Sequence, residues 1–258
     1  METKVALLGN PVEYSPSQWT HPAIFQQLRL VYEYRRMRTD PEELSARLKA
    51  LWEEGFHWLA VTMPLKSSIL EYMHEITSAA RESGAVNFVL RGNDGWVGDN
   101  TDGVGAAAAL MEVIDLEGAR CLVLGTGGAA RAIVHELRNV GALPVVWGRR
   151  PEAAFLLGET VARPIGEYDV VINATSVGMN PHPGHTPADW SRLYAKVAMD
   201  VVSSPRETLF LKEAAQRGAR TVSGWHMFAH LVREQFRRAY GLVDSEKIVD
   251  TVIDFAGK

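Results

Sequence analysis

The chain has 258 residues, of which 47% are hydrophobic and 22% charged, as in an ordinary globular protein with a sizeable core. A formal net charge of -4 gives no general attraction for polyanions, so nucleic acid and acidic membrane surfaces are not expected partners. The single cysteine, Cys121, excludes an internal disulfide, and no apolar run reaches membrane-spanning length. Residues 1–4 lack the pattern of a signal peptide. We therefore expect a soluble cytoplasmic protein that acts on small molecules.

The first hundred residues alternate between strand and helix patterns. We predict strands over residues 4–8, 32–36 and 57–62, and helices around residues 22–28 and from Asp40 to Gly55. The second helix is marked by Asp40-Pro41-Glu42-Glu43, which supplies a cap, a first-turn proline and early acidic residues. Strands that alternate with helices favour parallel pairing with right-handed crossovers.

A second alternating region follows Asp102 and an alanine-rich helix. Strand patterns alternate there with helix patterns, which predicts a doubly wound sheet of the Rossmann type; the strands are expected over residues 121–124, 144–147, 169–173, 197–202 and 221–222. Two further helices, 227–240 and 245–255, have no strand partner and are expected to pack on the first domain. The predicted fold is α/β with two domains. A parallel or mixed substrate domain covers residues 1–101 and is completed by 228–258, and a Rossmann-like domain covers residues 102–227.

A glycine-rich turn lies between a predicted strand and a predicted helix. It reads Gly125-Thr126-Gly127-Gly128-Ala129-Ala130 and follows the apolar run 121–124, which is the context of a phosphate-binding fingerprint. Gly125 permits a tight turn, Gly127 lets the backbone approach a pyrophosphate, and the helix directs its positive end at that charge. We predict a dinucleotide site here; the alternative is a turn that merely connects strand to helix.

The segment that distinguishes NAD from NADP follows the next predicted strand and has the sequence Gly148-Arg149-Arg150-Pro151. An acidic residue here would bind the ribose hydroxyls of NAD, whereas arginine accepts the extra phosphate of NADP. No acid stands in this segment, and two guanidinium groups suit a phosphate ester. We predict NADP as the cofactor; the alternative is a solvated surface pair.

Two polar segments, Val61-Thr62-Met63-Pro64-Leu65-Lys66 and Gly98-Asp99-Asn100-Thr101-Asp102-Gly103, carry a candidate reacting pair. Reduction of a ketone needs a hydride from the nicotinamide and a proton for the nascent alkoxide. Lys66 beside the Asp102 carboxylate would serve as the proton donor. The alternative is a surface ion pair.

Together these segments resemble the shikimate dehydrogenase family over nearly the whole chain. The substrate-side motifs are Gly9-Asn10-Pro11-Val12-Glu13-Tyr14-Ser15-Pro16-Ser17, Val61–Lys66, Gly84-Ala85-Val86-Asn87 and Gly98–Gly103. The cofactor-side motifs are Gly125–Ala130, Asn173-Ala174-Thr175-Ser176, and Gly224 with Met227.

The resemblance implies a role for each matching residue. Ser15 and Ser17 would hold a substrate carboxylate, Thr62 and Asn87 would bind ring hydroxyls, and Lys66 with Asp102 would form the acid–base pair. On the cofactor side, the implied contacts are Gly125, Thr126, Gly127, Gly128, Ala129, Arg149, Arg150, Thr175, Ser176, Gly224 and Met227. The implied reaction is the NADP-dependent interconversion of shikimate and 3-dehydroshikimate, in the chorismate pathway of aromatic amino acid biosynthesis.

The departures from the family pattern fall mostly on the substrate side. Ala60 replaces an asparagine, Ser203 a substrate-facing tyrosine and Leu231 a substrate-binding glutamine; the smaller departures are Gln18, Gly148 and Trp225-His226. Loss of such polar contacts weakens binding unless other groups replace them. Quinate or aminoshikimate oxidation therefore stays open, as does a catalytically silent ligand sensor. No metal site is expected, and the protein is expected to be a monomer or homodimer.

Overall fold

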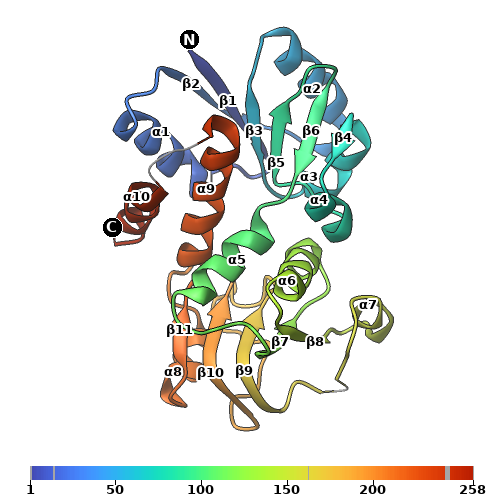
Figure 1. Cartoon of the computed structure of the whole chain (residues 1–258), viewed down its shortest axis with the longest axis vertical. Helices are drawn as coiled ribbons and strands as arrows, with labels where there is room; N and C mark the ends of the chain where they lie inside the picture. The colour runs from blue at the N-terminus through green and yellow to red at the C-terminus, as the bar shows by residue number, and fades with distance from the viewer. Residues whose placement is uncertain (1, 14, 162, 242–244, 258) are drawn as a thin grey trace. The chain divides into compact units, whose positions relative to one another are not determined.

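The computed structural model describes residues 2–13, 15–161, 163–241 and 245–257 (Figure 1). It contains two compact units. Unit 1 comprises Met1–Thr101 and Gln235–Lys258, and unit 2 comprises Asp102–Glu234. Each unit has its own sheet and its own cluster of buried apolar side chains, so each is described by itself.

The sheet of unit 1 has six strands in the order β2-β1-β3-β5-β6-β4. Its strands are β1 (Thr3–Gly9), β2 (Tyr32–Arg38), β3 (Trp58–Val61), β4 (Glu75–Ile76), β5 (Phe88–Arg91) and β6 (Trp96–Asp99). β1 pairs in parallel with β2 and β3, whereas β5 is antiparallel to β3 and β6. The sheet is therefore mixed. The β5–β6 hairpin was not predicted, because its strands are only four residues long and offer little alternation.

Short helices accompany this sheet: α1 (Ser17–Gln27), η1 (Pro41–Glu43), α2 (Leu44–Glu53), α3 (Leu65–Ser68), η2 (Ile69–Tyr72) and α4 (Ser78–Ser83). The helix start predicted at Asp40 is present and has a capping box, in which the Asp40 amide donates to Glu43 Oε2 over 3.1 Å. α1 begins at Ser17 rather than at Pro22, so this proline lies inside the helix. Ser17 is consequently part of a helix and not of the loop before it.

The end of the chain returns to unit 1 through α9 (Gly224–Tyr240) and α10 (Ser245–Gly257). Phe236 is fully buried against Phe25 and Trp58, with ring centroids 5.1 and 5.6 Å away. Trp58 Nε1 donates a hydrogen bond of 3.1 Å to the Tyr240 hydroxyl. This aromatic cluster fixes the last turns of α9 against β3 and α1.

The sheet of unit 2 has five parallel strands in the order β11-β10-β9-β7-β8. The strands are β7 (Arg120–Leu124), β8 (Leu143–Trp147), β9 (Gly166–Asn173), β10 (Leu193–Asp200) and β11 (Arg220–Val222). The chain leaves β7 for β8 on one side and later returns to β9 on the other, so the strand order reverses between β7 and β9. In doubly wound sheets, ligands bind outside the carboxyl ends of the strands at this reversal. The Rossmann-type prediction is confirmed.

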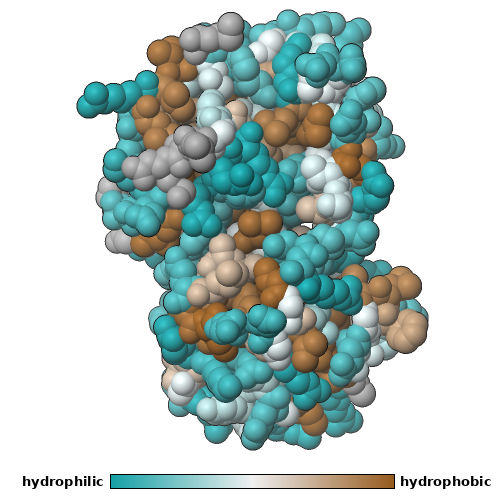
Figure 2. All heavy atoms as spheres, viewed as in Figure 1, coloured by the Kyte–Doolittle hydropathy of each residue, from teal (hydrophilic) through white to brown (hydrophobic). Residues whose placement is uncertain are grey.

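Four helices of unit 2 are α5 (Asp102–Met111), α6 (Gly128–Asn139), α7 (Pro151–Phe155) and α8 (Leu209–Gln216). α5 and α6 approach closely, because a Cβ on Gly103 would lie 2.3 Å from the Ala132 carbonyl oxygen. α7 carries apolar surface, which Figure 2 shows in brown over this helix; Phe155 is 74% exposed. None of the described helices is long and apolar enough to span a membrane.

Candidate active site

Backbone hydrogen bonds bring the predicted substrate segments of unit 1 together. The Asn10 amide donates to the Met63 carbonyl over 2.8 Å, and the Val86 amide donates to the Lys66 carbonyl over 2.7 Å. The Asn87 amide in turn donates to the Asp99 carbonyl over 3.1 Å. Segments far apart in the sequence therefore lie side by side, and the lysine-bearing segment is bonded to the asparagine-bearing one.

The Thr62 side chain requires a glycine beside it. The Thr62 amide donates to the Leu8 carbonyl over 2.9 Å, and a Cβ on Gly9 would lie 2.3 Å from Thr62 Cγ2. Only glycine fits at this strand end. Lys66 follows on α3, where its side chain is half-buried.

A buried amide–hydroxyl pair joins the second and third substrate segments. Asn87 is 3% exposed and Thr101 is fully buried. Asn87 Oδ1 accepts hydrogen bonds from the Thr101 amide (2.9 Å) and hydroxyl (3.3 Å), and Asn87 Nδ2 donates to Thr101 Oγ1 (3.1 Å). Asp102 is the next residue, buried at 3% exposure, where α5 begins. Asn87 thus fixes the backbone directly before Asp102.

The serine segment opens α1. Ser15 is half-buried and Ser17 is 6% exposed. The Ser17 carbonyl accepts a hydrogen bond of 3.1 Å from the Tyr34 hydroxyl and lies 3.2 Å from His21 Nδ1. Tyr14, within the same motif, lies outside the described residues. The segment therefore presents two serine side chains from a backbone that β2 and α1 hold in place.

The glycine loop of unit 2 lies at the point where the strand order reverses. Gly125 has a φ of 127°, and a Cβ there would lie 2.9 Å from the Ala174 carbonyl oxygen, on the loop after β9. A Cβ on Gly127 would meet no atom within 4 Å, so this backbone borders open space. α6 begins at Gly128, and its first amides follow the open backbone. These are the features of a phosphate site at a helix N-terminus.

The arginine pair after β8 is exposed. Neither Arg149 nor Arg150 forms a salt bridge with any residue in the described part of the chain. A Cβ on Gly148, just before them, would lie 2.6 Å from Thr126 Cγ2. Two cations without a counter-charge therefore stand beside the glycine loop.

The remaining residues predicted on the cofactor side lie on the loop after β9 and in the first turn of α9. Asn173 Oδ1 accepts from the Thr175 amide (3.0 Å) and hydroxyl (2.6 Å), which fixes the turn that leads to the exposed Ser176. A Cβ on Gly224 would lie 2.5 Å from the Val202 carbonyl oxygen, and Met227 is 5% exposed. The start of α9 thus packs directly on the end of β10.

Known proteins are similar to this chain over nearly its full length. Residues 7–89 match the shikimate dehydrogenase substrate binding domain. The NADP(+) shikimate dehydrogenase of Shouchella clausii is 33% identical over 270 residues, covering 98% of each chain. That of Thermococcus kodakarensis is 36% identical, covering 96% of this chain and 95% of its own. The chain belongs to the shikimate dehydrogenase family.

Solved structures of this family have the same fold. Shikimate 5-dehydrogenase from Thermus thermophilus, in complex with NADP(H) and shikimate, is 32% identical with a TM-score of 0.88; the match covers 98% of this chain and 99% of that one. The 5-ketofructose reductase of a Gluconobacter species is 26% identical with a TM-score of 0.85, over 99% of both chains. The fold thus also occurs in a protein named for a different substrate.

The residues that depart from the shikimate dehydrogenase pattern are well packed in this chain. Ala60 is 4% exposed on β3, and Leu231 is 9% exposed in α9. The Ser203 carbonyl accepts a 3.0 Å hydrogen bond from Trp225 Nε1. His226 is exposed and its Nδ1 lies 2.9 Å from Ser223 Oγ, so it already has a polar partner. The replacements at residues 60 and 231 are thus buried, whereas Ser203 and His226 each take part in a polar contact.

Burial shifts two ionisable groups of unit 2. It raises the pKa of Asp200, at the end of β10, to about 6, although hydrogen bonds from Thr208, Val202 and Asn173 oppose the shift. Burial, with a smaller contribution from Asp169, raises the pKa of Cys121 to about 12. The thiol is therefore protonated and unreactive at neutral pH.

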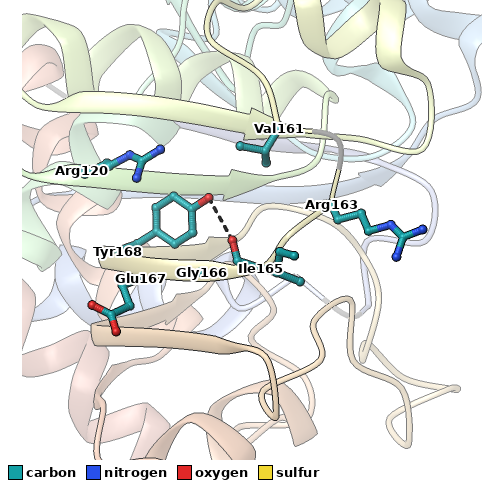
Figure 3. Close-up of a pocket in the computed structure, with 7 residues that line it drawn as sticks. All are labelled: Arg120, Val161, Arg163, Ile165, Gly166, Glu167 and Tyr168. Carbon is teal, nitrogen blue, oxygen red and sulfur yellow. Dashed lines mark hydrogen bonds between the residues drawn. The ribbon is translucent and has the colours of Figure 1, made fainter.

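A surface pocket of unit 2 lies away from the glycine loop. Figure 3 shows Arg120 and Tyr168 on its wall, with the Tyr168 hydroxyl donating to the Ile165 carbonyl over 3.4 Å. Arg120 is the first residue of β7, whereas the glycine loop follows Leu124, the last. The pocket therefore lies at the end of the sheet opposite to the ligand-binding end. Within the described ranges, no group of three or more His, Cys, Asp or Glu side chains is placed to hold a metal ion.

Proposed function

We propose that this chain is an NADP-dependent oxidoreductase that transfers a hydride between the nicotinamide and a ring hydroxyl or ketone of shikimate or 3-dehydroshikimate. The observation that carries the proposal is the bonding of three substrate segments in unit 1, where the Lys66 carbonyl binds Val86 and the Asn87 amide binds Asp99. The full-length similarity to shikimate dehydrogenases supports the same reaction.

NADP fits the residues of unit 2. The open backbone at Gly127 and the start of α6 suit the pyrophosphate, and the exposed Arg149 and Arg150 suit the extra phosphate. We infer that Thr175, Ser176, Gly224 and Met227 border the nicotinamide. When bound, this cofactor supplies or accepts the hydride.

Lys66 and Asp102 form the acid–base pair in this proposal. During ketone reduction the carbonyl carbon gains a hydride, and the Lys66 ammonium gives a proton to the carbonyl oxygen, so that a hydroxyl forms. During oxidation neutral Lys66 takes the hydroxyl proton. The Asp102 carboxylate is the partner of the lysine in this proton transfer. Both residues follow segments whose backbone is hydrogen-bonded to other parts of unit 1, as at Thr62 and Asp99.

Substrate recognition is assigned to four side chains. The Ser15 and Ser17 hydroxyls donate hydrogen bonds to the carboxylate, and Thr62 and Asn87 bind ring hydroxyls. Asn87 is already oriented by Thr101, which reduces the entropy lost when substrate binds. We expect a monomer or homodimer that needs neither nucleic acid nor a membrane for this reaction.

Apolar residues at two of the replaced positions favour a second group of substrates. Ala60 and Leu231 make no side-chain hydrogen bonds. A related ligand with fewer or different polar substituents would therefore lose less binding free energy at these two positions than shikimate does. Quinate and aminoshikimate are such candidates. A silent sensor is the remaining alternative, but binding alone does not require a lysine and an aspartate for proton transfer.

The test is a turnover panel of shikimate, quinate, aminoshikimate and simpler hydroxycyclohexene carboxylates, each with NADP and with NAD. We expect saturable activity with shikimate and NADP. Saturable activity with another member but not with shikimate would move the assignment to that substrate. If no member turns over while one stabilises the protein thermally, the sensor replaces the enzyme.

A further inference from the structure

One face of β2 packs against α1 in three successive pairs of side chains. Two pairs are ring contacts with centroids 4.8 and 5.8 Å apart, and the third is a hydrogen bond of 2.6 Å from Arg36 Nη1 to Gln18 Oε1. The spacing fits, because alternate residues of a strand share one face and residues three or four apart share one face of a helix. From the last turn of α1 toward its start, the pairs are Phe25–Tyr32, His21–Tyr34 and Gln18–Arg36. Arg36 therefore lies beside the first turn of α1.

Gln18 joins Arg36 to the serine segment. It directly follows Ser17, and its Nε2 donates to the Glu13 carbonyl while its Oε1 accepts from Arg36. The carboxamide thus bonds to the chain before the two serines and to a cation of β2. Residue 18 is one of the departures from the family pattern, which has a proline here, and a proline side chain could make neither hydrogen bond.

The charge of Arg36 is not balanced by a neighbouring acid. Its guanidinium is exposed and forms no salt bridge with any acidic residue that the structure describes. The hydrogen bond to Gln18 uses one of the five N–H donors of this group. The neighbouring Arg35 differs, because it forms salt bridges with both Glu33 and Glu54. β2 thus carries a balanced arginine next to one whose charge can act on a ligand.

A substrate carboxylate at the serine segment requires positive charge. The hydroxyls of Ser15 and Ser17 are neutral donors, and the exposed Glu13 on the same loop is acidic and repels a second carboxylate. The positive end of α1, a helix of 11 residues, favours an anion at its first turn. A guanidinium bonded to this segment adds a full charge of the required sign.

We propose that Arg36 is a specificity-determining residue that supplies positive charge to the substrate carboxylate, while Gln18 keeps its guanidinium at the serine segment. The inference rests on the proposed function and deepens it, because it names the group that favours carboxylates over neutral ring alcohols. Arg36 acts on binding and takes no part in the transfer of the hydride or the proton.

The test uses Arg36→Met, which keeps the apolar stem and removes the charge. We expect KM for the best carboxylate substrate of the panel to rise about twofold to fivefold, the effect of one exposed ion pair, while kcat and KM for NADP stay unchanged. Arg36→Lys should retain a KM near that of the wild type, and Arg36→Glu should raise KM further than Arg36→Met does. The matched control is Arg35→Met on the opposite face of β2, which should leave KM unchanged.

Ionic strength separates an effect of charge from a structural effect on the loop. The difference in KM between wild type and Arg36→Met should shrink as salt rises from about 0.01 M to about 1 M, because the Debye length falls from about 30 Å to about 3 Å. An unchanged KM in Arg36→Met, an equal rise in Arg36→Lys, or a difference that does not vary with salt would overturn the inference and leave the proposed function standing. A wild-type protein without turnover on any panel member would overturn both.

Discussion

Arg238, near the end of α9, donates a hydrogen bond to Asp99 Oδ2 and forms a largely buried ion pair with this carboxylate. The other Asp99 oxygen accepts from the Thr77 hydroxyl (2.6 Å) and the Asn100 amide (2.8 Å). Asp99 is followed directly by Asn100, Thr101 and the proposed catalytic Asp102. The ion pair therefore joins α9 to the segment that leads to Asp102, the carboxylate of the proposed acid–base pair.

Arg238→Met should destabilise the protein by about 3 to 5 kcal/mol, because it leaves a buried carboxylate without its counter-charge. Urea unfolding measures the difference. Lys49→Met removes one partner of the exposed Lys49–Glu53 pair and should change stability by less than about 1 kcal/mol. Equal effects of the two substitutions would show that Arg238 has no structural role of this kind.

Two glycines of unit 2 should respond oppositely to alanine. At Gly127 a Cβ meets open space, so Gly127→Ala should fold normally but weaken NADP binding, since the Cβ occupies the approach of the pyrophosphate. At Gly224 a Cβ would lie 2.5 Å from the Val202 carbonyl oxygen, so Gly224→Ala should cost about 1 to 3 kcal/mol in stability. Thermal unfolding and NADP titration check both. Unchanged NADP affinity in Gly127→Ala would remove this loop from the cofactor site.

Replacing Arg149 and Arg150 together by alanine should raise KM for NADP about tenfold to a hundredfold and leave KM for NAD unchanged, because charged hydrogen bonds to the extra phosphate are lost. Initial rates with both cofactors measure this. Arg163→Ala, at another exposed arginine of unit 2, is the control and should alter neither value. A parallel loss with NADP and NAD would contradict phosphate recognition by the pair.

Asp200 makes stability depend on pH in an unusual direction. Burial raises its pKa to about 6. The contribution of Asp200 to the free energy of unfolding is therefore fully present below the unfolded pKa of about 3.9, and it is lost as pH rises through 6. The loss is about 2 to 3 kcal/mol. The stability of Asp200→Asn relative to wild type should therefore rise between pH 4 and pH 7.

The control for Asp200 is Asp169→Asn. A hydrogen bond from Lys196 holds the pKa of Asp169 below its usual value, so this residue stabilises above its unfolded pKa and the stability is lost as pH falls. Urea unfolding between pH 3 and pH 8 measures the free energy of unfolding of each variant relative to wild type. Plotted against pH, this difference should have slopes of opposite sign for the two variants. Slopes of the same sign would contradict the assigned shift of Asp200.

The sequence predicted the parts of the fold that local patterns specify. The run 121–124, the glycine loop and the helix after it form one continuous strand–turn–helix signal, and the structure has all three elements. The hairpin of β5 and β6 was missed, although Asn93-Asp94-Gly95 is a turn signal that would have located it. Its four-residue strands were too short to show a period.

The substrate network was only partly accessible from the sequence. Motif resemblance singled out Asn87 and Lys66, because each stands in a recognisable segment. Gln235 contacts Thr101 across 134 residues of sequence, and no local pattern links them. A glutamine beside Phe236 on the apolar face of a helix was the available signal, but it does not reveal the partner.

Hydride transfer is tested most directly by NADPH that carries deuterium at the transferable C4 position. With 3-dehydroshikimate as the ketone, mass spectrometry should find one deuterium in the product formed by the wild type. Lys66→Ala should lower the rate at which this product forms by a factor of about 10² to 10⁴, while the variant still binds NADPH. Product without deuterium, or an undiminished rate in Lys66→Ala, would contradict a hydride transfer supported by Lys66.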